Sequence, residues 1–340
     1  MKPNPLRVDP TRTTDIRRRF AAEVRRRFLL LQRDIDDLVV KEDAFGIGTD
    51  RIMPGGLPAE RVENVRWFFA TATEKVKAFL KWVKERVDFH LLGNSQSEVD
   101  AGFWDQYLKE AMLRGRGRAF EDAIRKYGTG NLPFTAQTKS DFLRSAFSQP
   151  VPVERAKQLA SRTLTDLKGV TEAMATDMSR TLLDGFARGE HPRDIAKDLA
   201  ASVDGIGVKR GELIARTEVV RAHAEGQLDA LEEFGVSQVE PLVEWSTAGD
   251  GRVCPLCAPL NKLVLTVKEA RGMLPRHPQC RCAWIPAGVG EDPKGQKRGL
   301  KEAGTALLRS IDAETKRGTI KEKIRRSKWA GAGVRLKKRG

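Results

Sequence analysis

All four cysteines of the chain and one histidine lie between positions 254 and 282. Cys254 and Cys257 have the spacing C-x2-C, and after 19 residues His277 is followed by Cys280 and Cys282. A C-x2-C pair places two thiolates on one tight turn, and a second pair arriving from further along the chain can complete a tetrahedral zinc site. Five candidates for four positions leave no ligand position open to water. The pattern therefore predicts one structural zinc ion.

Two alternatives to zinc stay open, namely buried free thiols and local disulfides formed after release from a reducing cell. Cys280 and Cys282 would also point to opposite faces of a regular strand, so one of them is not a ligand unless the backbone bends there. Catalysis has less support, because the H-x-E arrangement of zinc deaminases and the H-E-x-x-H arrangement of zincins are both absent. A nucleophilic pair of Cys282 and His277 is conceivable, but no oxyanion motif accompanies it. We therefore predict that the chain is not an enzyme.

A second set of residues flanks the cysteines and is expected to play a structural part. Arg216 and Glu218 are interpreted as anchors of their helix to a small sheet, and Glu218 can pair with Arg221 three positions later. Asp250 suits a turn, in which its carboxylate accepts backbone N–H bonds. The indole of Trp245 is expected to cover the cysteines. The full set is Arg216, Thr217, Glu218, Trp245, Asp250 and Arg252.

Hydrophobic periodicity and Gly/Pro punctuation predict the elements that must position these residues. Glycines 115 and 117 weaken the third predicted helix, and separators at 168–169 and 204–207 divide the later ones. The fold class is therefore predicted as α+β, mainly helical, with a helical N-terminal region followed by helices, a small antiparallel sheet and the Cys/His cluster. Helices are expected at 10–42, 59–89, 103–127, 152–167, 170–188, 192–203 and 208–234, and strands at 238–247, 262–267 and 280–286.

Composition changes along the chain predict three regions. Residues 1–150 form a helical region with a basic start, 151–287 form the domain with the cysteines, and 288–340 form a basic linker and tail. Within the tail, 300–328 has the pattern of a basic amphipathic helix. We expect no secretory signal, because the first residues lack an apolar stretch, and no transmembrane helix.

The net charge of +15 is concentrated at the two ends of the chain. Residues 1–33 hold 10 basic and 3 acidic residues, net +7, and 288–340 hold 16 and 6, net +10. Basic ends point to an anionic partner, and we expect non-specific contact with double-stranded DNA, although a solvated helix face explains the arginine triplets equally well. The candidate residues are Arg17, Arg18, Arg19, Arg25, Arg26, Arg27, Arg325, Arg326, Lys337, Lys338 and Arg339.

Three motifs occur in an order that resembles the phage head morphogenesis domain of the phage Mu F-like minor head proteins. They are A-R-T-E at 215–218, W-S-T followed by D-G-R-x-C-x-x-C at 245–257, and H-P-Q-C-R-C at 277–282, and the resemblance covers roughly 165–287. It implies a structural role in virion assembly near the portal vertex, with the portal and other head proteins as partners and no membrane. The expected location is the virion, in the head interior or at the portal vertex, and the host cytoplasm during assembly.

Two other functions are compatible with parts of the sequence. A Cys/His zinc enzyme, such as a nuclease or a toxin-related hydrolase, is the main alternative. A host DNA-binding protein with a zinc knuckle ranks last, because no helix carries an obvious set of base-reading side chains.

Overall fold

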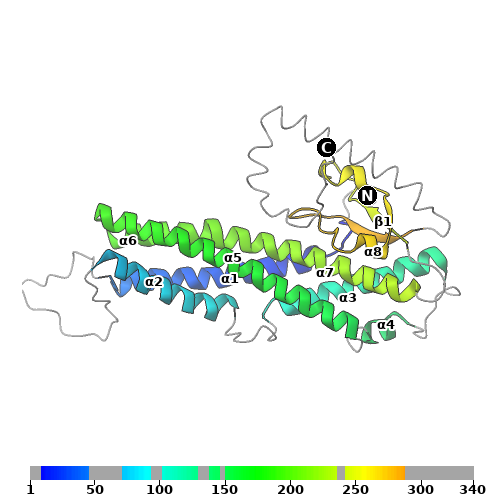
Figure 1. Ribbon diagram of the computed structural model, residues 1–340, viewed down its shortest axis with the longest axis horizontal. Coiled ribbons are helices and arrows are strands. Elements are labelled where there is room, and N and C mark those ends of the chain that lie inside the picture. The colour runs from blue at the N-terminus through cyan, green and yellow to red at the C-terminus, as the bar shows by residue number, and fades with distance from the viewer. Residues whose placement is uncertain are drawn as a thin grey trace, which may run out of the picture. The chain divides into compact units, whose positions relative to one another are not determined.

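The computed structural model describes residues 9–45, 71–92, 102–128, 138–145, 150–235 and 242–287 (Figure 1). It confirms a mainly helical α+β fold with one small antiparallel sheet. The helices are α1 (Thr14–Asp36), α2 (Ala72–Val87), α3 (Asp105–Tyr127), α4 (Lys139–Ser145), α5 (Pro150–Arg188), α6 (Pro192–Ser202), α7 (Lys209–Gly235) and α8 (Val267–Ala270). Three π-helical turns, η2 (Asp37–Lys41), η4 (Asp88–Leu92) and η7 (Val203–Val208), and one 3-10 turn, η8 (Ala258–Leu260), complete the helical elements among these residues.

The chain divides into two compact units, each made of separate stretches of sequence. Among the described residues, the helical unit comprises 17–45, 71–92, 102–106 and 157–216, and the sheet unit comprises 9–16, 107–128, 138–145, 150–156, 217–235 and 242–287. Helices α5 and α7 each contribute residues to both units. The boundaries inferred from composition at 150 and 287 stay predictions.

The apolar stripe predicted for the first helix is confirmed. Because its members recur every three or four residues, they fall on one face of α1 and of η2, which continues it. All of them are buried, with at most 5% of each side chain exposed: Ile16, Phe20, Val24, Phe28, Leu31, Ile35 and Leu38.

Aromatic side chains connect the elements of the helical unit, in which α1, α2, α5 and α6 run side by side (Figure 1). The ring of Phe45, which follows η2, lies 5.8 Å from that of Phe79 in α2 and 5.2 Å from that of Phe186 in α5. Phe28 of α1 fills the space beside Gly207 and Gly211, where a Cβ atom would meet its ring at 2.6 and 2.8 Å. The bundle core therefore depends on these large side chains and on glycines that admit them.

Two predicted helix breaks are wrong. α5 continues through Gly169, which faces open space, because the buried neighbours Leu167 and Val170 supply packing that outweighs the roughly 1 kcal/mol cost of an internal glycine. At 204–207 the chain remains helical as the π-helical turn η7, which joins α6 directly to α7. Gly207 serves close packing there rather than termination.

The sheet of the sheet unit has three antiparallel strands in the order β2-β1-β3, shorter than predicted. β1 is Leu242–Ser246, β2 is Val264–Thr266 and β3 is Ala283–Pro286. The register pairs Val243 with Leu265 and Trp245 with Trp284. The two tryptophan rings meet edge to face with centroids 5.2 Å apart, in a favourable geometry for aromatic pairs.

Glycines bring α3 and α7 of the sheet unit unusually close. A Cβ on Gly115 would lie 2.1 Å from the carbonyl oxygen of His223, and a Cβ on Gly226 would lie 2.3 Å from that of Met112. Each glycine thus faces the backbone of the other helix. Gly115 and Gly117 do not interrupt α3, which runs from Asp105 to Tyr127, because the close helix contact stabilises it.

Several predicted elements extend beyond the described residues. The second helix is seen from Ala72, after a capping box in which Thr71 and Glu74 bond reciprocally. Its start at 59 and the basic helix at 300–328 lie outside the described residues. Among the residues that are described, no helix is long and apolar enough to cross a membrane.

Candidate metal centre

The first half of the Cys/His cluster is a tight turn that follows β1. Asp250 starts it by accepting the backbone N–H of Val253 at its carbonyl oxygen, 3.1 Å away. The carbonyl of Cys254 then accepts the N–H groups of Cys257 and Ala258, both at 3.0 Å. The turn therefore brings the two C-x2-C thiols to the same side, as the spacing predicts.

The second half is a turn that precedes β3. The N–H of Cys280 donates to the carbonyl of His277 at 3.1 Å, and Gln279 adopts a positive φ of 63°. β3 starts only at Ala283, so neither Cys280 nor Cys282 lies in a regular strand. The backbone bends here, and both thiols turn toward the interior, where each is buried.

The two halves meet closely enough for metal coordination. Cys254 Sγ lies 3.0 Å from His277 Nε2, and Cys257 Sγ lies 3.9 Å from Cys280 Sγ. Two sulfur ligands 2.3 Å from a tetrahedral zinc ion are about 3.8 Å apart. Ligand atoms lie within 4.8 Å of one another in two groups, Cys254, Cys257 and His277 and then Cys257, Cys280 and Cys282. The donor types and spacings fit zinc, with Cys257 common to both groups.

Protons in the cluster are strongly redistributed. Hydrogen bonds from Cys257 and His277 lower the pKa of Cys254 to about 4, against the opposing effect of burial. Cys254 and Cys280 in turn raise the pKa of His277 to about 10. The pKa of Cys280 also falls well below its usual range, chiefly through Cys257, whereas that of Cys257 rises because Cys254 and Cys280 hold the negative charge.

Crowded soft donors of this kind favour a cation. Thiolates are the form in which cysteine binds metal, and metal binding displaces the protons that otherwise separate them. Two of the thiols already favour the thiolate form beside His277. The cluster is therefore electrostatically suited to a divalent ion.

Asp250 links the two halves of the cluster. Its carboxylate accepts two hydrogen bonds from Arg281, at 2.7 and 2.8 Å, and bonds from the side chain and backbone N–H of Arg252. Arg281 is the main reason that the pKa of Asp250 lies well below its usual range. The predicted pairing with Arg252 is confirmed, but sequence reasoning missed Arg281, whose only signal is its place between two cysteines.

Two tryptophans enclose the buried side of the cluster. Trp245 and Trp284 are fully buried, and they share a hydrophobic cluster with Cys257, Cys280 and Cys282. Trp245, which is expected to cover the cysteines, thus lies in one hydrophobic cluster with three of them. The thiol of Cys282 has a pKa raised to about 12, because Cys280 and burial outweigh the opposing effect of Cys257.

Polar side chains of α7 fasten this helix to the sheet. The amide of Gln227 donates to the carbonyl of Trp284 at 2.7 Å and accepts its N–H at 3.3 Å, so it extends the hydrogen bonding of β3. Arg216 and Glu218 were expected to provide such anchors. The ion pairs described for them lie within α7, from Arg216 to Glu212 at 2.9 Å and from Glu218 to Arg221 at 3.1 Å, and their role as anchors stays a prediction. The predicted pairing of Glu218 with Arg221 is confirmed.

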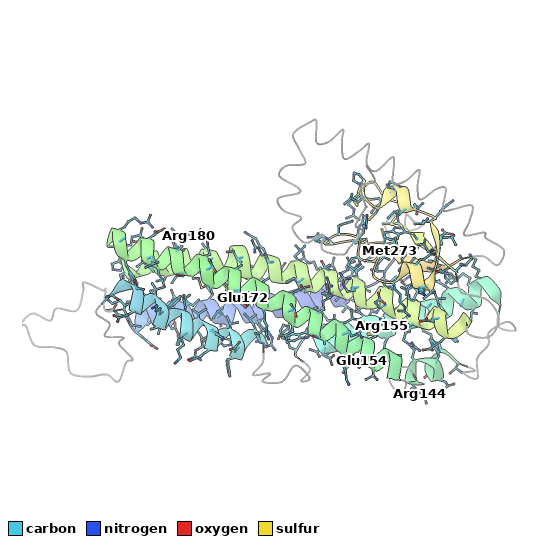
Figure 2. All side chains as sticks on the ribbon, viewed as in Figure 1. Arg144, Glu154, Arg155, Glu172, Arg180 and Met273 are labelled. Carbon is cyan, nitrogen blue, oxygen red and sulfur yellow. The ribbon has the colours of Figure 1, made fainter. Side chains whose placement is uncertain are left out.

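A second anchor is a buried ion network. Arg271, which follows α8, lies 3.0 Å from Glu225 and 2.8 Å from Asp229, and it also pairs with Glu232. Arg155, near the start of α5 (Figure 2), approaches Asp229 at 3.6 Å. Burial raises the pKa of Asp229 even though both arginines oppose the shift. Charged residues at these positions gave no signal in the sequence that distinguished them from surface residues.

The arginine triplets of α1 are partly occupied by contacts within the protein. Arg26 and Arg27 both bind Glu23, and Arg27 also donates to the carbonyl of His90 at 2.6 Å. Arg25 lies 3.6 Å from Glu212, while Arg18 is exposed. Arg27 is thus a structural residue. The predicted basic residues of the tail, from Arg325 to Arg339, lie outside the described residues, and Thr217 is half-buried on α7.

Residues 176–285 match the model of a family described as Phage Mu protein F like protein. The match includes all five Cys/His donors and the Arg216–Glu218 motif, and it confirms the resemblance inferred from the three motifs. No curated protein and no solved structure matches the chain.

Proposed function

We propose that this protein is a structural minor head protein of a tailed bacteriophage, acting in head morphogenesis near the portal. The family that matches residues 176–285 indicates head morphogenesis. The observation that carries the structural role is the partly buried Cys/His cluster inside that segment. Its donors lie on two turns that flank the sheet, so their role is to fix a fold that other head proteins recognise.

We propose that Cys254, Cys257, His277 and Cys280 hold one zinc ion. Two of these donors come from each turn, and two donor pairs, Cys254 with His277 and Cys257 with Cys280, join the two turns. Zinc in such a set supplies a cross-link and no reaction. We leave Cys282 outside this set, as a buried thiol in the same hydrophobic cluster as the two tryptophans.

The alternative, a Cys/His zinc enzyme, has less support. Catalytic zinc sites keep a ligand position open for water or substrate. Here five donors are available for four positions, and three of them are buried in an apolar cluster. The arrangement therefore favours a closed site.

Contact with packaged DNA is the second part of the proposal. The basic ends of the chain supply the charge, and among the α1 arginines the exposed Arg18 is better placed for phosphate contact than Arg27. Deleting residues 300–340 should weaken DNA binding and leave attachment to the head unchanged. Loss of both together would assign the tail to the anchor instead.

Two measurements on the full chain test the proposal. Protein purified under reducing conditions should contain about one zinc per chain, and Cys254→Ser should lose it. The wild type should co-sediment with portal-containing procapsids, and the zinc-free variant should not. Zinc-free wild type would reject the metal site, whereas wild type that ignores both portal and procapsids would reject the assembly role.

A further inference from the structure

A pocket of about 250 Å³ in the sheet unit is lined almost entirely by polar and charged side chains. No cysteine lines it, and its walls come from α3, the start of α4, α7 and the segment before α1. Four of its side chains are basic and one is acidic, apart from a buried histidine. The lining residues are Thr11, Arg12, Arg114, Arg118, Glu121, Lys139 and His223.

The segment that carries Arg12 into this pocket is rigidly built. The carboxylate of Asp9 accepts the backbone N–H and the hydroxyl of Thr11, at 3.1 and 2.8 Å, and the hydroxyl of Thr14 at 2.9 Å. The N–H of Arg12 donates to the carbonyl of Asp9, and Arg12 itself has a positive φ of 51°. A residue with a branched or long side chain rarely adopts this conformation, so the surrounding bonds hold Arg12 in place.

The other basic side chains come from α3 and α4. Arg114 and Arg118 are four residues apart, so they lie on one face of α3. Arg114 binds Asp15 and Glu110, and it also donates to the carbonyl of Arg12 at 3.0 Å. These bonds position the guanidinium at the pocket.

Arg118 has donor capacity that the protein does not satisfy. Its Nε donates to Asp122 at 3.1 Å, and only 14% of its side chain is exposed. Its Nη1 is buried and has no hydrogen-bond partner among the described residues. A buried N–H of a charged group without an acceptor is unfavourable, and an anion toward which the guanidinium turns would supply that acceptor.

Three of the basic side chains at the pocket, Arg114, Arg118 and Lys139, each pair with a carboxylate, so the charge that no ion pair offsets is that of Arg12. Arg12 forms no ion pair with another residue in the described part of the chain. Lys139 pairs with Glu121, and Lys139 together with Arg12 keeps the pKa of that carboxyl below its usual value. The acidic side chain is therefore charged, and Arg12 and the free donor of Arg118 remain for a ligand.

We propose that this pocket binds a phosphate group through Arg12, Arg118 and Lys139. Guanidinium and ammonium groups from separate segments surround phosphate oxygens well, and guanidinium donors match them in pairs. The same chemistry is offered by free phosphate and by the backbone of DNA. The site is independent of the arginine triplets of α1 and of the proposed role in head assembly.

The test is calorimetric titration of the full chain with inorganic phosphate at low ionic strength, followed by competition with a short duplex DNA. The diagnostic variant is Arg12→Gln, because Arg12 is exposed and its loss breaks no described ion pair. Arg144→Gln is the matched control, since Arg144 lies exposed on α4 outside the pocket (Figure 2). Circular dichroism verifies that both variants stay folded.

We expect one phosphate per chain, with affinity about tenfold lower in Arg12→Gln and unchanged in Arg144→Gln. If duplex DNA displaces phosphate and shows the same dependence on Arg12, the source of the phosphate is the DNA backbone. If DNA does not compete, the ligand is a free phosphate. No saturable binding, or an equal loss in both variants, overturns the proposal.

Discussion

The helical unit and the sheet unit are stabilised by different kinds of contact. In the helical unit, apolar side chains at helical spacing pack together, with Phe28 seated against Gly207. In the sheet unit, thiols, buried amides and ion networks connect short elements, as Gln227 does between α7 and β3. The comparison teaches that a short sheet beside long helices combines a buried apolar cluster, which includes Trp245 and Trp284, with specific polar and sulfur contacts that join its separate segments.

The largest expected effect is loss of the proposed zinc site. Cys257→Ser removes the donor common to both groups and should destabilise the sheet unit by at least about 5 kcal/mol, since structural zinc binds zinc-finger peptides with about 10–16 kcal/mol. Hydrogen–deuterium exchange should increase in peptides of 242–287 and remain low in those of α1. Zinc content of the purified variant should fall to background.

Cys282→Ser is the matched control for that substitution. It removes a buried thiol that we place outside the ligand set, so zinc content should stay near one per chain. Zinc loss in both variants would show that Cys282 is a ligand, and the proposed set would then be wrong.

The second-largest effect is expected from loss of apolar packing in the helical unit. Phe28→Ala should destabilise the helical unit by about 3–5 kcal/mol, because a buried ring is lost and leaves a cavity beside Gly207. Zinc content should not change. Increased exchange in the sheet unit at the same denaturant concentration would contradict the separation of the two kinds of stabilisation.

Two glycines sharpen the comparison between close packing and open surface. Gly115→Ala should cost about 1–3 kcal/mol, because the new Cβ would lie 2.1 Å from the backbone oxygen of His223. Gly169→Ala, at an exposed position of α5, should instead stabilise the protein by about 0.5–1 kcal/mol. Urea unfolding of both variants measures the difference, and equal effects would argue against the close contact of α3 with α7.

The smallest expected effect concerns the arginine triplets. Arg26 and Arg27 lower the pKa of Glu23, so its ion pairs stabilise the folded protein above the pKa of the unfolded chain and lose that effect as the pH falls. Glu23→Gln should lower the free energy of unfolding by roughly 0.5 kcal/mol at about pH 7. This difference from the wild type should vanish at about pH 3 and shrink in high salt. A difference independent of pH would show that Glu23 acts through packing.

Much of the fold follows from periodicity. The apolar residues from Ile16 to Leu38 recur at helical spacing, and this spacing alone predicts both the helix and its buried face. The breaks expected at Gly169 and at 204–207 fail because a glycine signals local freedom and says nothing of the tertiary contacts that keep a helix continuous. Gly207 leaves room for the ring of Phe28, which is distant in sequence.

In the candidate site, too, local spacing predicts some residues, whereas contacts between distant segments could not be predicted. The five donors are visible in the sequence because zinc requires particular ligand atoms at short spacing. The sequence also indicates that Cys280 and Cys282 can face the same side only if the backbone bends there. The contacts that hold the donors were not predictable. Arg281 reaches Asp250 across 31 positions, and Gln227 reaches Trp284 across 57, and neither pair has a spacing rule.

The two cysteine turns flank the stretch 258–276, which contains β2 and α8. With one zinc ion bound between Cys257 and His277, this stretch becomes a closed ring. A single protease cut inside it then leaves two fragments that the metal joins in addition to the pairing of β1 with β2. Under the proposed role in the head, the assembled surface would thus survive a nick that weakens an uncrosslinked chain.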